Sequence, residues 1–190
     1  MTKVKSIIIL FIAVAGAFLI YHHFDKKEED VVVKNKFASE YNLVDENNVF
    51  MYSSADEVTN TLENGTGFIF FCTPESTWCN YYAKYLNEEL IKYDMGPVLY
   101  YNIRDDRSLN TIKYQKILTL LDQYLYKDDL LNSKIYMPDL TAVKDGVILG
   151  HDNQTSLIAS DLTGEDYWTN EKVQEFKTTI KGFYDLIYGE

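Results

Sequence analysis

Both cysteines of this 190-residue chain lie in one stretch, Phe68 to Cys79, which reads FIFFCTPESTWC. Its apolar first half is typical of a strand that is covered on both faces. A polar turn containing Pro74 follows, and Ser76 is a suitable N-cap for a helix. The stretch therefore predicts a strand, a turn and a helix, and any thiol chemistry of the protein is confined to it.

The composition sets limits on the class of protein. Hydrophobic residues make up 46% of the chain, which is enough to build a core. The formal net charge of -11 argues against nucleic acid or anionic lipid headgroups as partners, because the summed field would repel both. Two cysteines cannot form a disulfide framework, so the fold must depend on its hydrophobic core.

The amino-terminal segment predicts a membrane anchor. An apolar run of about fifteen residues from Ile7 to Tyr21 follows a short basic tail, and His22 to Phe24 could extend it toward the roughly 20 residues of a spanning helix. We expect residues 1–24 to be an uncleaved single-pass anchor; the alternative is a signal peptide that is removed, giving a secreted protein. Residues 25–40 are expected to be a charged spacer, and residues 41–190 the globular domain, outside the cytoplasm.

Segments with strand and helix periodicity alternate along the rest of the chain. The first three strands are expected at residues 48–52, 67–72 and 97–103. Helices are expected after Ser54, which opens a capping box, after Ser76, and from Asn110. A hairpin is expected around Lys144-Asp145-Gly146, followed by a polar excursion and a terminal helix. This order predicts an α/β fold with a central mixed sheet flanked by helices.

The helix after Ser76 should bury one face. Cys79, Tyr82, Leu86 and Leu90 recur at three- and four-residue spacing and form a single apolar stripe. With Ser76 as N-cap, Cys79 is the third helical residue. The helix N-terminus favours a thiolate at this position, whereas burial on the stripe disfavours one, so Cys79 is either an inert thiol or a reactive one.

The arrangement resembles the thioredoxin-like superfamily from about Asn48 to Glu190. FIFFCTPESTWC is similar to the redox segment of that family, and the segment from Met137-Pro138 to Gly146 resembles its cis-proline and hairpin element. Membrane-tethered thioredoxin-like proteins of Gram-positive bacteria, including the bacteriocin-transport accessory type, have comparable sequences. The resemblance implies a thioredoxin-like fold and substrate contacts by Trp78, Met137 and Pro138. No Cys/His spacing in the chain is that of a zinc site, and we expect no cofactor or metal.

Two departures from the family pattern bear on chemistry. The usual C-x-x-C motif corresponds here to Ser76-Thr77-Trp78-Cys79, so serine occupies the attacking position. A serine hydroxyl is not ionised near neutral pH and cannot form a disulfide, so Ser76 cannot begin thiol-disulfide exchange. The family's buried carboxylate would fall at Ile69, which leaves no proton acceptor there.

Two functions therefore remain open. The first is thiol-disulfide exchange or a redox accessory role with a degenerate site formed by Cys79, Cys72 and Ser76. The second is a redox-inactive module that binds exported polypeptides. Cys72 is either a small core residue or a disulfide partner of Cys79, which requires Cα atoms within roughly 7 Å of each other. His151 and Asp152 are expected to be a solvated loop pair after the last strand.

Overall fold

The computed structural model describes residues 29–93, 95–157 and 161–189. The expected anchor or signal at residues 1–24 lies outside the described residues. Within them, none of the helices combines the length and the apolar character needed to cross a bilayer.

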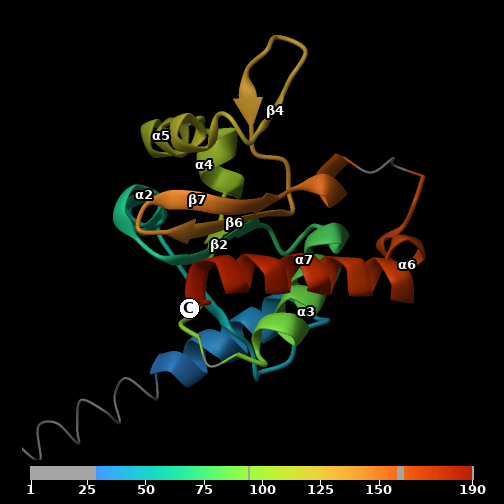
Figure 1. Ribbon diagram of the computed structural model, residues 1–190. Helices are drawn as coiled ribbons and strands as arrows, with labels where there is room; N and C mark the ends of the chain where they lie inside the picture. Colours follow the sequence, from blue (N-terminus) through green and yellow to red (C-terminus); the bar gives the residue numbers. More distant parts are fainter. Residues whose placement is uncertain (1–28, 94, 158–160, 190) are drawn as a thin grey trace, which may run out of the picture.

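Five strands form a mixed sheet in the order β1-β3-β2-β6-β7 (Figure 1). Their bounds are β1 Phe50–Tyr52, β2 Gly67–Cys72, β3 Val98–Asn102, β6 Asp139–Lys144 and β7 Val147–Asp152. Strands β1, β3 and β2 are mutually parallel, whereas β6 pairs antiparallel with both β2 and β7. The predicted α/β class and mixed sheet are confirmed, with the hairpin at the antiparallel edge.

Helices cover both faces of this sheet (Figure 1). The labelled helices are α2 Ala55–Asn64, α3 Thr77–Leu90, α4 Arg104–Ser108, α5 Ile112–Leu121, α6 Gly164–Tyr167 and α7 Asn170–Tyr188. Helices α3 and α7 pack on one face, and α2 and α5 on the other. A short hairpin of β4 (Tyr126–Lys127) and β5 (Ser133–Lys134) follows α5, and a 3-10 turn (Gln154–Leu157) follows β7.

Strand β2 lies at the centre of two hydrophobic cores. All of its residues are buried, because successive side chains point alternately into the two faces. Phe68, Phe70 and Cys72 join the core beneath α3 and α7. Ile69 and Phe71 join the core beneath α2 and α5. This placement explains why the sequence of the strand is apolar without alternation.

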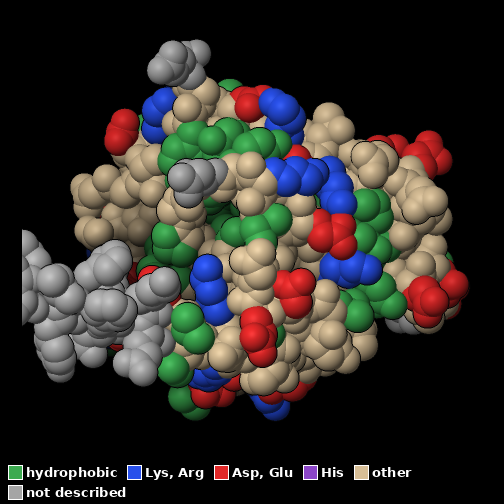
Figure 2. Space-filling model, turned by 90° about the horizontal axis from the view of Figure 1, so that it is seen from below, with side chains coloured by type: hydrophobic (Ala, Val, Ile, Leu, Met, Phe, Trp, Pro, Cys, Tyr) green, Lys and Arg blue, Asp and Glu red, His purple; other side chains and the backbone are tan. Residues whose placement is uncertain are grey.

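A helix over residues 29–40 occupies much of the segment expected to be a charged spacer. Phe37 within it and Tyr41 just after it are fully buried. The Phe37 ring stacks on those of Tyr41 and Phe50, with centroids 4.3 and 4.1 Å apart. The charged residues of this segment remain on the outside, and Figure 2 shows side chains of both charges interspersed with hydrophobic ones on this face. The helix is therefore part of the domain.

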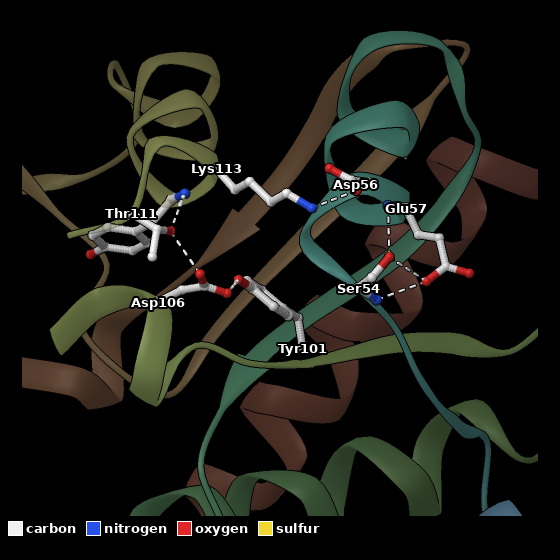
Figure 3. Close-up of polar contacts among 8 residues, drawn as sticks. Ser54, Asp56, Glu57, Tyr101, Asp106, Thr111 and Lys113 are labelled. Carbon is white, nitrogen blue, oxygen red and sulfur yellow. Dashed lines mark hydrogen bonds and ion pairs between the residues drawn. The ribbon is translucent and has the colours of Figure 1, made fainter. Parts of the chain in front are cut away.

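Polar contacts fix the helix starts on the α2 and α5 side (Figure 3). The predicted capping box is present, with the Glu57 carboxylate accepting from the Ser54 backbone N–H at 2.7 Å. Helix α5 begins later than the expected Asn110, because Thr111 is its N-cap and Asn110 has a left-handed φ of 47°. Asp106 accepts hydrogen bonds from the hydroxyls of Tyr101 and Thr111, which lowers the pKa of Asp106.

Candidate functional site at the end of the central strand

The two cysteines form a disulfide at the carboxyl end of β2. The S–S distance is 2.03 Å and the Cα atoms of Cys72 and Cys79 are 5.9 Å apart. Both residues are fully buried in the core beneath α3 and α7. The two possibilities for Cys72 are therefore realised together, since it is a core residue and also the partner of Cys79.

Ser76 caps the helix that carries Cys79. Its Oγ accepts a hydrogen bond from the backbone N–H of Cys79 at 3.3 Å. This contact satisfies one of the free N–H groups of the first helical turn. Cys79 is the third residue of α3, as predicted, and it is buried together with the rest of the predicted stripe, Tyr82, Leu86 and Leu90.

The turn between the cysteines is held closed by polar contacts. Glu75 accepts a hydrogen bond from the Thr73 hydroxyl and forms an ion pair with Arg104 at the start of α4. The hydrogen bond from Thr73 and the nearby Arg104 charge help to hold the pKa of Glu75 below its ordinary value. Asn80 Nδ2 donates to the Pro74 carbonyl at 3.1 Å from within α3. These contacts connect the turn to the start of α4 and to α3.

Pro138 lies at the same end of the sheet as the disulfide. The Met137–Pro138 peptide bond is cis. In the antiparallel pair of β2 and β6, Asp139 lies opposite Phe71. Pro138 precedes Asp139, so it lies at the carboxyl end of β2, next to Cys72 in the register. Pro138 is buried, and Met137 is half-buried between the two cores. We call the group formed by Cys72, Ser76, Cys79 and Pro138 the disulfide corner.

Trp78 directs its ring toward α6. Its indole packs edge-on against Tyr167 with the ring centroids 5.6 Å apart, and the side chain remains half-exposed. A hollow of about 440 Å³ next to it is lined by Trp78, Tyr81, Leu162 and Gly164 among others. A side chain at Gly164 would meet the Tyr81 ring, because a Cβ atom there would lie 2.6 Å from it.

A buried acid–histidine pair was missed by the sequence analysis. Asp139 is fully buried, and its Oδ2 lies 3.2 Å from Nε2 of His151, whose side chain is 7% exposed. Burial raises the pKa of Asp139, and the proximity of His151 opposes this shift. Asp139 lies on β6, which pairs with β2, the strand that contains Ile69. Its carboxylate points to the face covered by α2 and α5, and not into the core that holds the cysteines.

The expectation that His151 and Asp152 form a solvated loop pair is wrong. Strand β7 extends through Asp152, so the two side chains point to opposite faces of the sheet. His151 faces Asp139, whereas Asp152 is 8% exposed and accepts a hydrogen bond from Tyr82 at 2.8 Å. In the sequence, the alternation that begins at Val147 was the signal for this burial. The polar side chains of His151 and Asp152 made that alternation hard to recognise.

The disulfide corner contains a reducible bond, but both of its cysteines are buried in the folded protein. Exchange begins when a thiolate reaches a disulfide sulfur in line with the S–S bond. Both cysteines are closed off from solvent, and the neighbouring hydroxyl of Ser76 is an N-cap. The arrangement therefore fits a covalent tie between β2 and α3 better than a reactive centre.

Comparisons with known proteins add no assignment: no family model, no curated protein and no solved structure matches this chain. The structure thus defines an α/β protein with a mixed sheet and a buried disulfide that joins its central strand to the following helix.

Proposed function

We propose that this protein is a thioredoxin-like binding module, tethered to the outer face of the cell membrane, that holds exported polypeptides without redox turnover. The observation that carries the proposal is the complete burial of both cysteines beside a serine in the attacking position. A domain that retains this geometry but lacks an accessible thiol can bind a polypeptide chain but cannot exchange disulfides with it.

The disulfide and the cis peptide bond support the kinship and the compartment. The order of strands and helices and the cis bond before Pro138 agree with what the resemblance implies. A disulfide between Cys72 and Cys79 is typical of proteins that fold in an oxidising exterior. The apolar run from Ile7 to Tyr21 supplies the tether in this proposal.

The binding surface in this proposal runs beside the start of α3. Trp78 is half-exposed next to the hollow that Tyr81 and Gly164 also line, and aromatic side chains in such positions supply contact area at low entropic cost. Met137, half-buried before Pro138, provides a flexible apolar contact on the other side of the corner.

A binding measurement with a thiol-free probe tests the proposal. Full-length protein in detergent is titrated into fluorescein-labelled, reduced and carbamidomethylated ribonuclease A, a basic polypeptide that is unfolded and has no free cysteine, and anisotropy is followed. We expect saturable binding that Trp78→Ala weakens. Tyr126→Ala, which removes an exposed aromatic from the β4 strand, should leave binding unchanged. Equal loss in both variants, or no binding by the wild type, contradicts the proposal.

Insulin reduction with dithiothreitol distinguishes the redox alternative. The wild type should not exceed the uncatalysed rate, because no exposed thiol is present to attack. Ser76→Cys should gain activity, since it restores a C-x-x-C spacing with Cys79. Strong activity of equal size in both proteins would show that the Cys72–Cys79 bond opens and exchanges, and would favour the oxidoreductase function.

A further inference from the structure

A hollow lies where strands β1 and β3 begin, and we call it the β1 hollow. It has a volume of about 570 Å³. Its walls come from the helix over residues 29–40, from the residues that lead into β1 and β3, and from the end of α3. Apolar side chains that are exposed or half-exposed make up much of the lining: Val33, Val49, Met51, Ile91, Met95 and Pro97.

Tyrosine rings continue this apolar surface from the β1 hollow to the end of α7. Tyr93 lines the hollow, and its ring stacks on that of Tyr184 with the centroids 4.1 Å apart. The Tyr184 ring in turn lies 5.2 Å from that of Tyr188, which is 37% exposed. Tyrosine is enriched where proteins meet the headgroup region of a bilayer, because its ring is apolar and its hydroxyl can stay hydrated. The composition of this surface therefore suits a membrane interface.

The β1 hollow lies close to the point where the chain continues toward the expected anchor. Asp30 lines the hollow, and the anchor is expected to end at Phe24. A fully extended chain covers at most about 3.6 Å per residue, so the end of the anchor lies within about 22 Å of Asp30. A tether of this length keeps the hollow near the bilayer surface.

The charges beside the β1 hollow suit a neutral lipid. Asp30 and Lys34, one turn apart on the same helix, contribute one charge of each sign to the lining. The net charge of -11 on the chain disfavours anionic headgroups. A lysine beside an apolar surface can lay its stem along that surface and place its ammonium at the level of the lipid phosphates. The occupant with matching chemistry is a zwitterionic phospholipid.

We infer that the domain docks on the outer leaflet of the membrane through the β1 hollow. Ile91, Met95 and Pro97 contact the lipid in this arrangement, and the tyrosines lie at headgroup level. The inference rests on the tether of the proposed function and adds a fixed orientation to it.

Docking through the β1 hollow turns the disulfide corner away from the bilayer. Strands β1, β3 and β2 are parallel, so the hollow lies at their amino ends, whereas Cys72 lies at the carboxyl end of β2. Helix α3 connects the two ends of the sheet, with Trp78 in its first turn and Ile91 at its C-cap. Its length is about 20 Å. Figure 1 shows α6, which Trp78 faces, on the opposite side of the molecule from the helix over residues 29–40. Exported polypeptides then reach Trp78 from the side away from the lipid.

Quenching by brominated lipid tests the docking. Full-length protein is reconstituted into vesicles of dioleoylphosphatidylcholine or of its dibrominated analogue, whose bromine atoms quench tryptophan on contact. A tryptophan is added at Ile91 or, as a matched control, at Leu109, which is 74% exposed and follows β3 at its carboxyl end. The emission added by Ile91→Trp should be lost in the brominated vesicles. The emission added by Leu109→Trp, and that of the native Trp78 and Trp168, should be retained.

A second pair of variants tests the apolar contact itself. Met95→Glu in the Ile91→Trp protein places a charge on the lipid-facing surface and should restore the emission. Met95→Leu keeps an apolar side chain and should leave the quenching in place. Neither change should alter binding of the ribonuclease A probe in detergent, because Met95 and Trp78 lie at opposite ends of α3.

Each contrary outcome has a distinct meaning. If Ile91→Trp emits equally in both kinds of vesicle while the protein still floats with the lipid, the docking is overturned and the tether is retained. Equal quenching of Ile91→Trp and Leu109→Trp overturns the orientation, and this comparison remains decisive if Met95→Glu does not fold. Unquenched Ile91→Trp together with loss of ribonuclease A binding in Met95→Glu assigns the hollow to polypeptide instead.

The same experiment separates failure of the inference from failure of the proposed function. Protein that does not float with the vesicles overturns the tether, and the docking with it. Quenching confined to Ile91→Trp, in a protein that does not bind ribonuclease A, supports the docking and overturns the binding function.

Discussion

The disulfide corner and the hollow between α6 and α7, which Asp152, Thr155, Tyr167 and Trp168 line among others, lie on the same side of the sheet but differ in exposure to solvent. In the corner, both sulfur-bearing residues are fully buried and Ser76 is occupied as a cap. In the hollow, Trp168 Nε1 and Thr155 Oγ1 are buried and make no hydrogen bond among the described residues. Tyr82 links the two regions, since it belongs to the core that holds the cysteines and donates to Asp152. The disulfide is therefore closed to solvent, whereas the hollow is open to it.

The largest effect is expected from opening the disulfide. Reduction of the Cys72–Cys79 bond, whose cysteines are 7 residues apart, should lower the free energy of unfolding by about 2–3 kcal/mol through the entropy of the unfolded chain. Urea unfolding with and without dithiothreitol measures this change. The double variant Cys72→Ala/Cys79→Ala should not respond to the reductant. A wild-type midpoint that is equally insensitive would contradict a structural role for the disulfide.

Tyr82→Phe tests the link between the two regions. The variant leaves the Asp152 carboxylate without its hydrogen bond from the phenol and should cost about 1–3 kcal/mol, as measured by urea unfolding. Tyr93→Phe is the matched control, because Glu89 loses a similar bond but keeps its ion pair with Lys92. If both variants lose the same free energy of unfolding, the Tyr82–Asp152 hydrogen bond stabilises the protein no more than the Tyr93–Glu89 hydrogen bond does.

Ser76→Ala sharpens the contrast within the disulfide corner. Loss of the N-cap should lower the free energy of unfolding by about 1 kcal/mol, whereas Ser76→Thr should retain most of the stability. Thermal or urea unfolding of both variants gives the comparison. Unchanged stability in Ser76→Ala would mean that the hydroxyl is not engaged as a cap, and would weaken the argument against a reactive role for this position.

The smallest effect is expected at Asp139, on the opposite face of the sheet from the cysteines. Because burial raises its pKa, the folded state binds the proton more tightly than the unfolded state does. The stability of the wild type relative to Asp139→Asn should therefore fall as the pH rises above the ordinary value of 3.8. Urea unfolding across a pH series measures this difference, and His151→Gln, which removes the opposing partner, should steepen it. A wild type that gains stability over the variant in this range contradicts the assignment.

Local sequence patterns predicted the start of α2 and the elements that form the disulfide corner. The apolar run of β2, the capping box at Ser54, the cap at Ser76 and the stripe from Cys79 to Leu90 all appear where they were expected. Each depends on residues within a few positions of one another, which is why the chain itself reveals them. The cis bond before Pro138 and its place beside β2 were also expected, in that case from the resemblance.

The buried polar groups could not be predicted in the same way. Asp139, His151 and Asp152 resemble surface residues by type, and their burial follows from the extent of β7 and from its pairing with β6. The helix over residues 29–40 was missed for a related reason. Its charged majority indicates a solvated segment, and only the contacts of Phe37 with Tyr41 and Phe50 place it in the core.

The amino-acid sequence by itself determined the α/β class, the position of the sole cysteine pair and the cap beside it. Periodicity and capping act over a few residues, so they are written directly in the chain. The tertiary structure decided that the two sulfurs are bonded and closed to solvent, and that Asp152, Thr155 and Trp168 share one hollow. Burial and access are properties of packing between distant segments, and no local pattern specifies them.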